Sequence, residues 1–88
     1  MKRIWYEKAW KEYELCLEQD RRAIKKINKL LVDIERNGEK IGLGKPEALI
    51  GNFSGWYSRE IDKKNRLIYR VTENGIEIIS CRTHYGDK

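Results

Sequence analysis

Residues 65–83, "NRLIYRVTENGIEIISCRT", contain the pattern that decides the fold. Two runs rich in β-branched and aromatic residues, 65–71 and 75–83, flank a short polar segment, which is typical of a β-hairpin. The pair Asn74-Gly75 supports this interpretation, because both residues tolerate the positive φ angles of a tight hairpin turn. We therefore expect two antiparallel strands joined by a two-residue turn.

The expected turn also predicts which residues pair across the hairpin. Glu73 would pair with Ile76, and the same register continued along both strands places Arg66 opposite Thr83. The next residue, His84, is the single histidine of the chain. Opposed Cβ atoms lie about 4.5–5.5 Å apart and diagonal neighbours remain within reach, so His84 should lie beside Arg66. A bulge would change the face that each side chain occupies, but not their proximity.

Upstream of the hairpin, residues 7–37 have the spacing of two amphipathic helices. Apolar and aromatic residues recur at intervals of three and four between positions 10 and 17, and a second apolar stripe runs from 24 to 34. Asp20 is suited to cap the second helix, and Asn37-Gly38 is suited to end it. Such a helix pair needs another layer to cover its apolar face.

Two further strands complete the predicted sheet, at "KRIWY" (2–6) and "FSGWYSREI" (53–61). The element order is therefore β-α-α-β-β-β. The predicted fold class is α+β, with an antiparallel sheet and two helices packed on one face, in a single domain over residues 1–88. The glycine-rich stretch 38–52 predicts a long loop, and such loops often carry functional residues.

Composition limits the class of protein. With 88 residues, 40% of them hydrophobic and 38% charged, the chain can build one core and is too apolar for a disordered tail. It has no run near the roughly 20 apolar residues of a transmembrane helix and no signal-peptide pattern. We therefore expect a cytoplasmic protein that is not in the membrane, with Cys16 and Cys81 reduced. One histidine and two separated cysteines predict no metal site, and nothing indicates a cofactor.

The chain is moderately basic, with a net charge of +5 and a pI near 9.3, which favours a polyanionic partner such as nucleic acid. On the second predicted helix, basic side chains form either a solvated face or a ridge that follows a phosphate backbone. These side chains are Arg22, Lys25, Lys26 and Lys29.

Charged residues near the histidine suggest a site for acid–base chemistry. Arg59 and Arg66, on predicted strands, could bind a phosphate in bidentate fashion. Glu47 follows a proline in the long loop, and it matters only if it converges with His84 and Arg66. Together these residue types suggest cleavage of RNA, in which one group takes the 2′-hydroxyl proton, another protonates the leaving 5′-oxygen, and a cation stabilises the phosphate.

The aromatic residues divide between core and surface. Trp56 and Tyr85 lie on or beside the predicted sheet, where stacking on a base is an alternative to core packing for Trp56. Four other aromatic residues fit core positions: Trp5, Trp10, Tyr13 and Tyr69.

Several longer motifs resemble those of one known family. The resemblance runs from "IWYEKAWKEY" to Tyr85 and is carried by "GKPE" (44–47), "NFSGWYSREI" (52–61), "NRLIYRV" (65–71) and "CRTHY" (81–85). These motifs look like those of the YoeB toxins of bacterial toxin–antitoxin systems, a branch of the RelE-like messenger-RNA interferases. The chain departs from the family at Ile50 and Glu60, where basic residues are common.

The resemblance implies a RelE-like microbial ribonuclease fold and a toxin that cleaves messenger RNA in the ribosomal A site. Glu47 matches the family's general base and His84 its general acid, while Arg66 matches the arginine that stabilises the phosphate. Tyr85 matches the tyrosine that shapes the substrate site. The implied reaction is metal-independent and leaves a 2′,3′-cyclic phosphate and a 5′-hydroxyl. The residues predicted to bind RNA or the ribosome are Arg59, Lys45, Trp56, Arg22, Lys25, Lys26 and Lys29.

The resemblance also implies partners. A YefM-like antitoxin would bind and silence the toxin, operator DNA would be bound only through the antitoxin complex, and a homodimer is a further assembly to test. Two alternatives remain at this stage: a non-enzymatic toxin of the RelE/ParE fold, and a small basic regulator that binds nucleic acid by itself.

Overall fold

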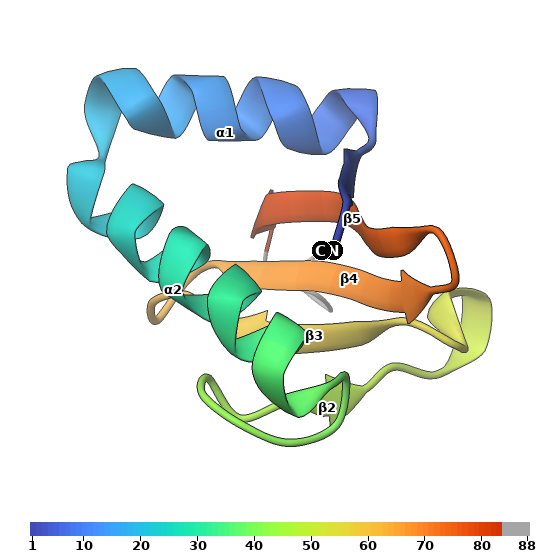
Figure 1. Cartoon of the computed structure of the whole chain (residues 1–88). Helices are drawn as coiled ribbons and strands as arrows, with labels where there is room; N and C mark the ends of the chain where they lie inside the picture. Colours follow the sequence, from blue (N-terminus) through green and yellow to red (C-terminus); the bar gives the residue numbers. More distant parts are fainter. Residues whose placement is uncertain (84–88) are drawn as a thin grey trace.

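The computed structural model describes residues 1–83, so the predictions for His84 and Tyr85 fall outside the described residues. The described part contains two α-helices, a short 3-10 helix and five strands (Figure 1). In chain order these are β1 (Arg3–Trp5), α1 (Glu7–Gln19), α2 (Arg21–Asn37), β2 (Glu47–Ala48), η1 (Gly51–Phe53), β3 (Tyr57–Glu60), β4 (Arg66–Thr72) and β5 (Gly75–Thr83).

The five strands form one sheet in the order β1-β5-β4-β3-β2. The α+β class and the predicted element order are confirmed, but the sheet is mixed. Strand β1 runs parallel to β5, whereas the other neighbouring pairs are antiparallel. Parallel pairing is open to β1 because the helices and three other strands separate it from β5 and supply the long crossover that parallel strands require. The two-residue strand β2 was expected to be loop.

One residue joins the two helices. The Asp20 side chain accepts a hydrogen bond from the Ala23 amide at 3.1 Å, which confirms it as the N-cap of α2. Its own amide donates to the Cys16 carbonyl at 2.8 Å and closes the last turn of α1. Helix α2 ends as predicted at Asn37, followed by Gly38 with a φ of 86°.

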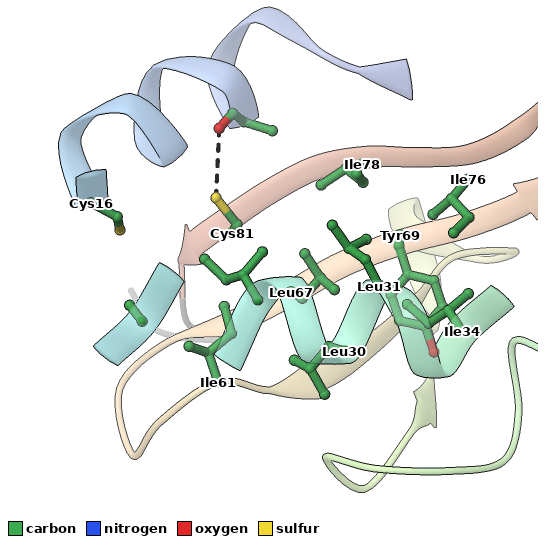
Figure 2. Packing of buried hydrophobic residues seen from close by; sticks show 13 residues of the cluster. Cys16, Leu30, Leu31, Ile34, Ile61, Leu67, Tyr69, Ile76, Ile78 and Cys81 are labelled. Atoms are coloured by element: carbon green, nitrogen blue, oxygen red, sulfur yellow. Dashed lines mark hydrogen bonds between the residues drawn. The ribbon is translucent and has the colours of Figure 1, made fainter. Parts of the chain in front are cut away.

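The core lies between the helices and one face of the sheet. In Figure 1, α2 crosses in front of β4 and β3 while α1 runs along β5. Figure 2 shows side chains from both layers meeting, and a hydrogen bond of 3.5 Å from the Cys81 thiol to the Ala9 carbonyl ties β5 to α1. The core includes Ile27, Leu30, Leu31 and Ile34 from α2, Leu67 and Tyr69 from β4, and Ile76, Ile78 and Cys81 from β5.

The four aromatic residues predicted for the core differ in how deeply they are buried. Tyr69 is fully buried, as expected. Trp5 and Tyr13 are half-buried and pack against the core. Trp10 is 43% exposed, so the prediction of a core position was wrong for it. It lies at the rim of the core, where its ring contacts Trp5 and stacks on Tyr13.

The hairpin forms where predicted, but its turn is shifted. Thr72 pairs with Gly75, so the turn consists of Glu73 and Asn74 instead of Asn74-Gly75. Gly75 has a φ of 136°, and a Cβ atom on it would lie 2.3 Å from the Lys2 carbonyl oxygen. The glycine is thus needed for the close approach of the segment before β1.

Two register shifts then correct the pairing along the hairpin. Tyr69 pairs with Ile78, Ile68 with Ser80, and Arg66 with Thr83, so β5 gains one residue over β4 at each step. These irregularities restore the predicted pairing of Arg66 with Thr83, which the structure confirms.

Candidate active site on the open face of the sheet

The face of the sheet opposite the helices carries the candidate site. Side chains alternate between the two faces along a strand. In β4, Leu67 and Tyr69 belong to the core under the helices, so Arg66, Ile68 and Arg70 point to the other, open face.

Arg66 is the centre of this site. Its Nη2 atom lies 2.9 Å from Oε1 of Glu47. Its Nε donates to Oγ of Ser58 at 2.9 Å, and Nη2 also donates to the Lys45 carbonyl at 3.3 Å. The guanidinium is therefore held from three sides, while its side chain remains 13% exposed and that of Glu47 is 66% exposed.

Three neighbouring strands bring these groups together. Glu47 in β2 pairs with Ser58 in β3, and β3 pairs in turn with β4, in which Arg66 lies. Arg66 also pairs with Thr83 in β5, the residue that precedes His84 in the chain. Of the four predicted catalytic residues, the structure brings Glu47 and Arg66 into contact.

The segment before Glu47 has a distinctive backbone. Among residues 1–83, Lys45 is the one non-glycine residue with a positive φ, at 52°. A lysine in the left-handed region costs free energy, which the surrounding contacts must offset. Here the strained peptide turns the Lys45 carbonyl toward Arg66 and leaves the lysine residue exposed.

Chemically, this arrangement combines an accessible carboxylate with an immobilised guanidinium. A guanidinium matches the geometry of a phosphate oxyanion, and a carboxylate beside it can accept a proton from a nearby hydroxyl. Because Ser58 and the Lys45 carbonyl orient Arg66, little reorganisation of the cation is needed when a negative charge develops next to it.

The prediction that Arg59 contacts RNA is wrong for this structure. Arg59 is 0% exposed, and its side chain lies among the core residues on the helix side of β3. The alternation of Ser58 and Arg59 explains the error, because neighbouring residues of a strand face opposite sides and Ser58 takes the open face. Arg59 bonds Asp33 and Tyr69 instead.

Trp56 belongs to a second cluster on the open face. The Arg70 guanidinium lies 4.3 Å from the centroid of the Trp56 ring, and its Nε is 2.9 Å from Oε1 of Glu77. Tyr6 completes the cluster, with its hydroxyl donating to Glu77 at 3.1 Å and its ring meeting Trp56 edge to face. The half-buried Trp56 thus shares a face with Arg66, but its ring already has cationic and aromatic neighbours.

The basic residues of α2 do not join the site. Helix α2 covers the face of the sheet opposite to Glu47 and Arg66, as the core contacts show. Arg22, Lys25 and Lys29 are exposed and Lys26 is half-buried, so the ridge exists as a separate surface on the helix layer.

A half-buried carboxylate in α1 holds the end of β5 by hydrogen bonds. Glu12 in α1 accepts hydrogen bonds from the Cys81 amide at 2.9 Å and the Ser80 hydroxyl at 3.1 Å, and it pairs with Lys8. Burial by itself would raise the pKa of Glu12, but the hydrogen bonds from Lys8, Cys81 and Ser80 outweigh it and lower the pKa overall. Helix α1 therefore holds the strand just before its last residues.

Sequence reasoning missed Ser58 and Glu12. Ser58 could have been found from the alternation along β3, because it lies two residues before Glu60 on the face that Arg66 shares. The contacts of Glu12 could not be predicted from the sequence pattern, because its partners Ser80 and Cys81 lie about 70 residues away in the chain.

Two further features of the described residues bear on the kind of site. Within residues 1–83, no group of three His, Cys, Asp or Glu side chains is arranged to hold a metal ion. Neither α1 nor α2 is long and apolar enough to cross a membrane.

Comparison with known proteins gives consistent matches in sequence. A family model described as the YoeB-like toxin of bacterial type II toxin–antitoxin systems matches residues 5–85. Toxin YoeB of Escherichia coli K12 is 46% identical over 85 residues, which cover 97% of this chain and 100% of that protein. Toxin YoeB of Synechocystis is 40% identical over 97% of this chain and 98% of that protein.

Solved structures agree with these matches. YoeB in a heterotetrameric YoeB–YefM toxin–antitoxin complex from Staphylococcus aureus superimposes with a TM-score of 0.91 at 42% identity, over 97% of this chain and 98% of that one. YafQ from E. coli, at 16% identity and a TM-score of 0.76, shares the fold. The architecture is thus that of the small α+β bacterial toxins. Within that class, the chain belongs to the YoeB-like toxins of type II toxin–antitoxin systems.

Proposed function

We propose that this toxin is a ribosome-dependent endoribonuclease that cleaves messenger RNA in the ribosomal A site and so inhibits translation. The observation that carries the proposal is the contact of 2.9 Å between Arg66 and the exposed carboxylate of Glu47, on the open face of the sheet. This pair supplies a proton acceptor and a phosphate-binding cation within one site.

In the proposed reaction, Glu47 takes the proton of a ribose 2′-hydroxyl. The 2′-oxygen then forms a bond to the adjacent phosphorus, and the bond from phosphorus to the 5′-oxygen breaks. Arg66 stabilises the negative charge on the phosphate oxygens. His84, which follows Thr83 in the chain, is proposed to protonate the leaving 5′-oxygen, and Tyr85 to shape the substrate site. The products are a 2′,3′-cyclic phosphate and a 5′-hydroxyl, formed without a metal ion.

The candidate site is exposed to solvent, which is why we propose that the ribosome is needed for cleavage. Glu47 is 66% exposed and lies at an edge strand, so the described residues offer few groups to orient a flexible RNA chain. Orientation of the reacting groups can account for several orders of magnitude in rate. We propose that the ribosomal A site orients the RNA for the reaction, and that Lys45 and Trp56 contact the RNA there. The basic ridge of α2, formed by Arg22, Lys25, Lys26 and Lys29, is proposed to contact ribosomal RNA on the helix side.

The proposed partners follow from the relatives. YoeB of S. aureus has been solved both in complex with YefM and as a dimer. We propose that a YefM-like antitoxin silences this toxin by placing acidic and apolar side chains over Arg66 and Trp56, in competition with RNA phosphate. Operator DNA would be bound only through that complex, in the cytoplasm. Arg59 takes no part in this surface, because it is buried.

The test is cleavage of a defined messenger RNA on purified ribosomes, with the RNA ends mapped and the same RNA without ribosomes in parallel. Glu47→Gln and Arg66→Lys should each reduce the rate by about 10²–10⁴-fold while leaving the fold intact. Glu73→Gln, at the exposed hairpin turn, is the matched control and should cleave like the wild type. Wild-type rates in both site variants, or equal cleavage of free RNA, would refute the proposal.

A further inference from the structure

The guanidinium of Arg59 has all of its donors occupied by groups of this chain. Arg59 is 0% exposed, and the Nε, Nη1 and Nη2 atoms of its side chain make five hydrogen bonds at 2.5–3.1 Å. An arginine has five N–H donors, so none is left for a ligand. The acceptors are the Tyr69 hydroxyl, the Asp33 carboxylate and the carbonyl oxygens of Gly38, Ile41 and Leu43.

Three of the five acceptors belong to the loop between α2 and β2. The two side chains that bind Arg59 contact the same loop. Asp33 accepts a hydrogen bond from the Leu43 amide at 3.0 Å, and the Tyr69 hydroxyl donates to the Glu39 carbonyl at 2.6 Å. Arg59 is therefore the centre of a buried polar network that holds residues 38–43, a stretch without helix or strand.

This loop leads directly into the candidate site. The Gly44 carbonyl accepts a hydrogen bond from the Glu60 amide at 2.7 Å, which ties the end of the loop to β3. The next residue, Lys45, has the positive φ that turns its carbonyl toward Arg66. Glu47 follows two residues later and contacts the same guanidinium.

Tight packing leaves the loop little freedom to move around Arg59. A Cβ atom on Gly42 would lie 1.9 Å from the Asp33 carboxylate and 2.9 Å from Nη1 of Arg59. A Cβ atom on Gly44 would lie 3.1 Å from Cβ of Arg59 and 2.9 Å from Leu30. Both glycines have positive φ angles, so the backbone is fitted to the guanidinium and to the side chains around it.

We propose that Arg59 is a positioning residue: it fixes the loop 38–45 and thereby sets the place of Glu47 beside Arg66. The inference rests on the proposed ribonuclease function. It gives Arg59 a role in the rate of the chemical step and none in binding RNA. The Asp33 carboxylate neutralises its charge inside the protein, which adds to the separation of Arg59 from the substrate.

The chemistry of the side chain explains why arginine suits this position. A buried ion pair contributes little net stability over well-packed apolar residues, so stability alone is a weak reason for it. A planar guanidinium can bind five acceptors spread around it, whereas the ammonium group of a lysine has three donors on one nitrogen. Arg59→Lys thus keeps the charge and removes the geometry that holds the loop.

The experiment compares Arg59→Lys and Arg59→Met with the wild type and with Arg36→Lys, an exposed arginine of α2 that serves as control. Each protein is assayed on programmed ribosomes below its own unfolding transition, with kcat and KM measured separately. Amide hydrogen exchange over residues 40–48 is measured on the same samples. For folded Arg59→Lys we expect kcat to fall about ten- to a hundredfold with KM within about threefold, because misplacement of a reacting group lowers the rate without weakening binding. Exchange should be faster in this segment alone.

Other results would overturn the inference. A higher, salt-dependent KM with unchanged kcat would mean that Arg59 binds RNA. A lower thermal midpoint with wild-type kcat and exchange would mean that it only stabilises the fold. If Arg59→Met does not fold, Arg59→Lys and Asp33→Asn still provide both readouts. If the wild type itself does not cleave RNA, the ribonuclease proposal fails, and unchanged exchange in Arg59→Lys would separately refute the hold of Arg59 on the loop.

Discussion

Replacement of Gly42 by alanine tests how rigidly the loop is fitted to the buried ion pair. The added Cβ would lie 1.9 Å from the Asp33 carboxylate, so Asp33 and Arg59 must separate or the loop must move. An alanine at the φ of 130° costs about 1–2 kcal/mol. Breaking a buried ion pair costs about 3–5 kcal/mol when one partner stays unpaired. Asp33 is 14% exposed and can partly regain water, so we expect about 3–5 kcal/mol in total.

For a domain of this size, 1 kcal/mol corresponds to about 4–8 °C, so the thermal midpoint should fall by about 12–40 °C. Urea unfolding followed by circular dichroism gives the free energy directly. Gly55→Ala is the matched control, because Gly55 has a φ of 94° and open space where its Cβ would be, and should cost about 1–2 kcal/mol. If Gly42→Ala destabilises the protein no more than Gly55→Ala does, the loop is not tightly fitted to the ion pair and the reasoning fails.

Three more predictions concern stability and reactivity. Burial would raise the pKa values of Glu12 and Asp33, but their hydrogen bonds and cationic neighbours lower them below the ordinary 4.5 and 3.8. The two carboxylates therefore contribute their full stabilisation above these ordinary pKa values, and the contribution is lost as pH falls through the lower pKa values of the folded state. We expect the free energy of unfolding to decrease below about pH 4.5. The decrease should be less steep in Asp33→Asn, which lacks one of the two carboxylates. Equal stability at pH 6 and pH 3 would contradict this. Burial raises the pKa of the Cys81 thiol to about 12, so iodoacetamide at pH 8 should modify it only after unfolding, as mass spectrometry of native and denatured samples would show. Gly75→Ala should destabilise the protein more than Gly55→Ala in urea unfolding, because it also pushes on the Lys2 carbonyl; equal losses would argue against this contact.

Local signals in the sequence were sufficient for most of the fold. Asp20 marked the start of the second helix, because capping depends on neighbouring residues alone. The position of the turn was missed because the demand on Gly75 comes from a distant segment, the backbone at Lys2. Parallel pairing of β1 was missed for the same reason, since nothing within residues 3–5 specifies a partner strand.

The candidate site was predictable in part. The pairing of Arg66 with Thr83 was right even though the turn was wrong, because two shifts in β5 compensated for it. Arg59 was misassigned because its charge was given more weight than its place in the strand. Its neighbour Ile61 lies two residues away and is buried, which marks the same face as interior. Three of the five acceptors of Arg59 lie in a loop with no periodic pattern, so its hydrogen-bond network could not be predicted from the sequence.

The sheet order has a consequence for how the toxin is made. Among residues 1–83, strand β1 pairs with β5 alone, so residues 3–5 acquire a partner strand only after residues 76–78 have been made. Roughly 70 residues separate them, and contacts this far apart in the chain slow the folding of small domains. Because synthesis proceeds at about 5–20 residues per second, β1 stays unpaired for several seconds while the rest of the chain is made. The sheet therefore reaches its full width only after residues 76–78 have been synthesised and can pair with β1.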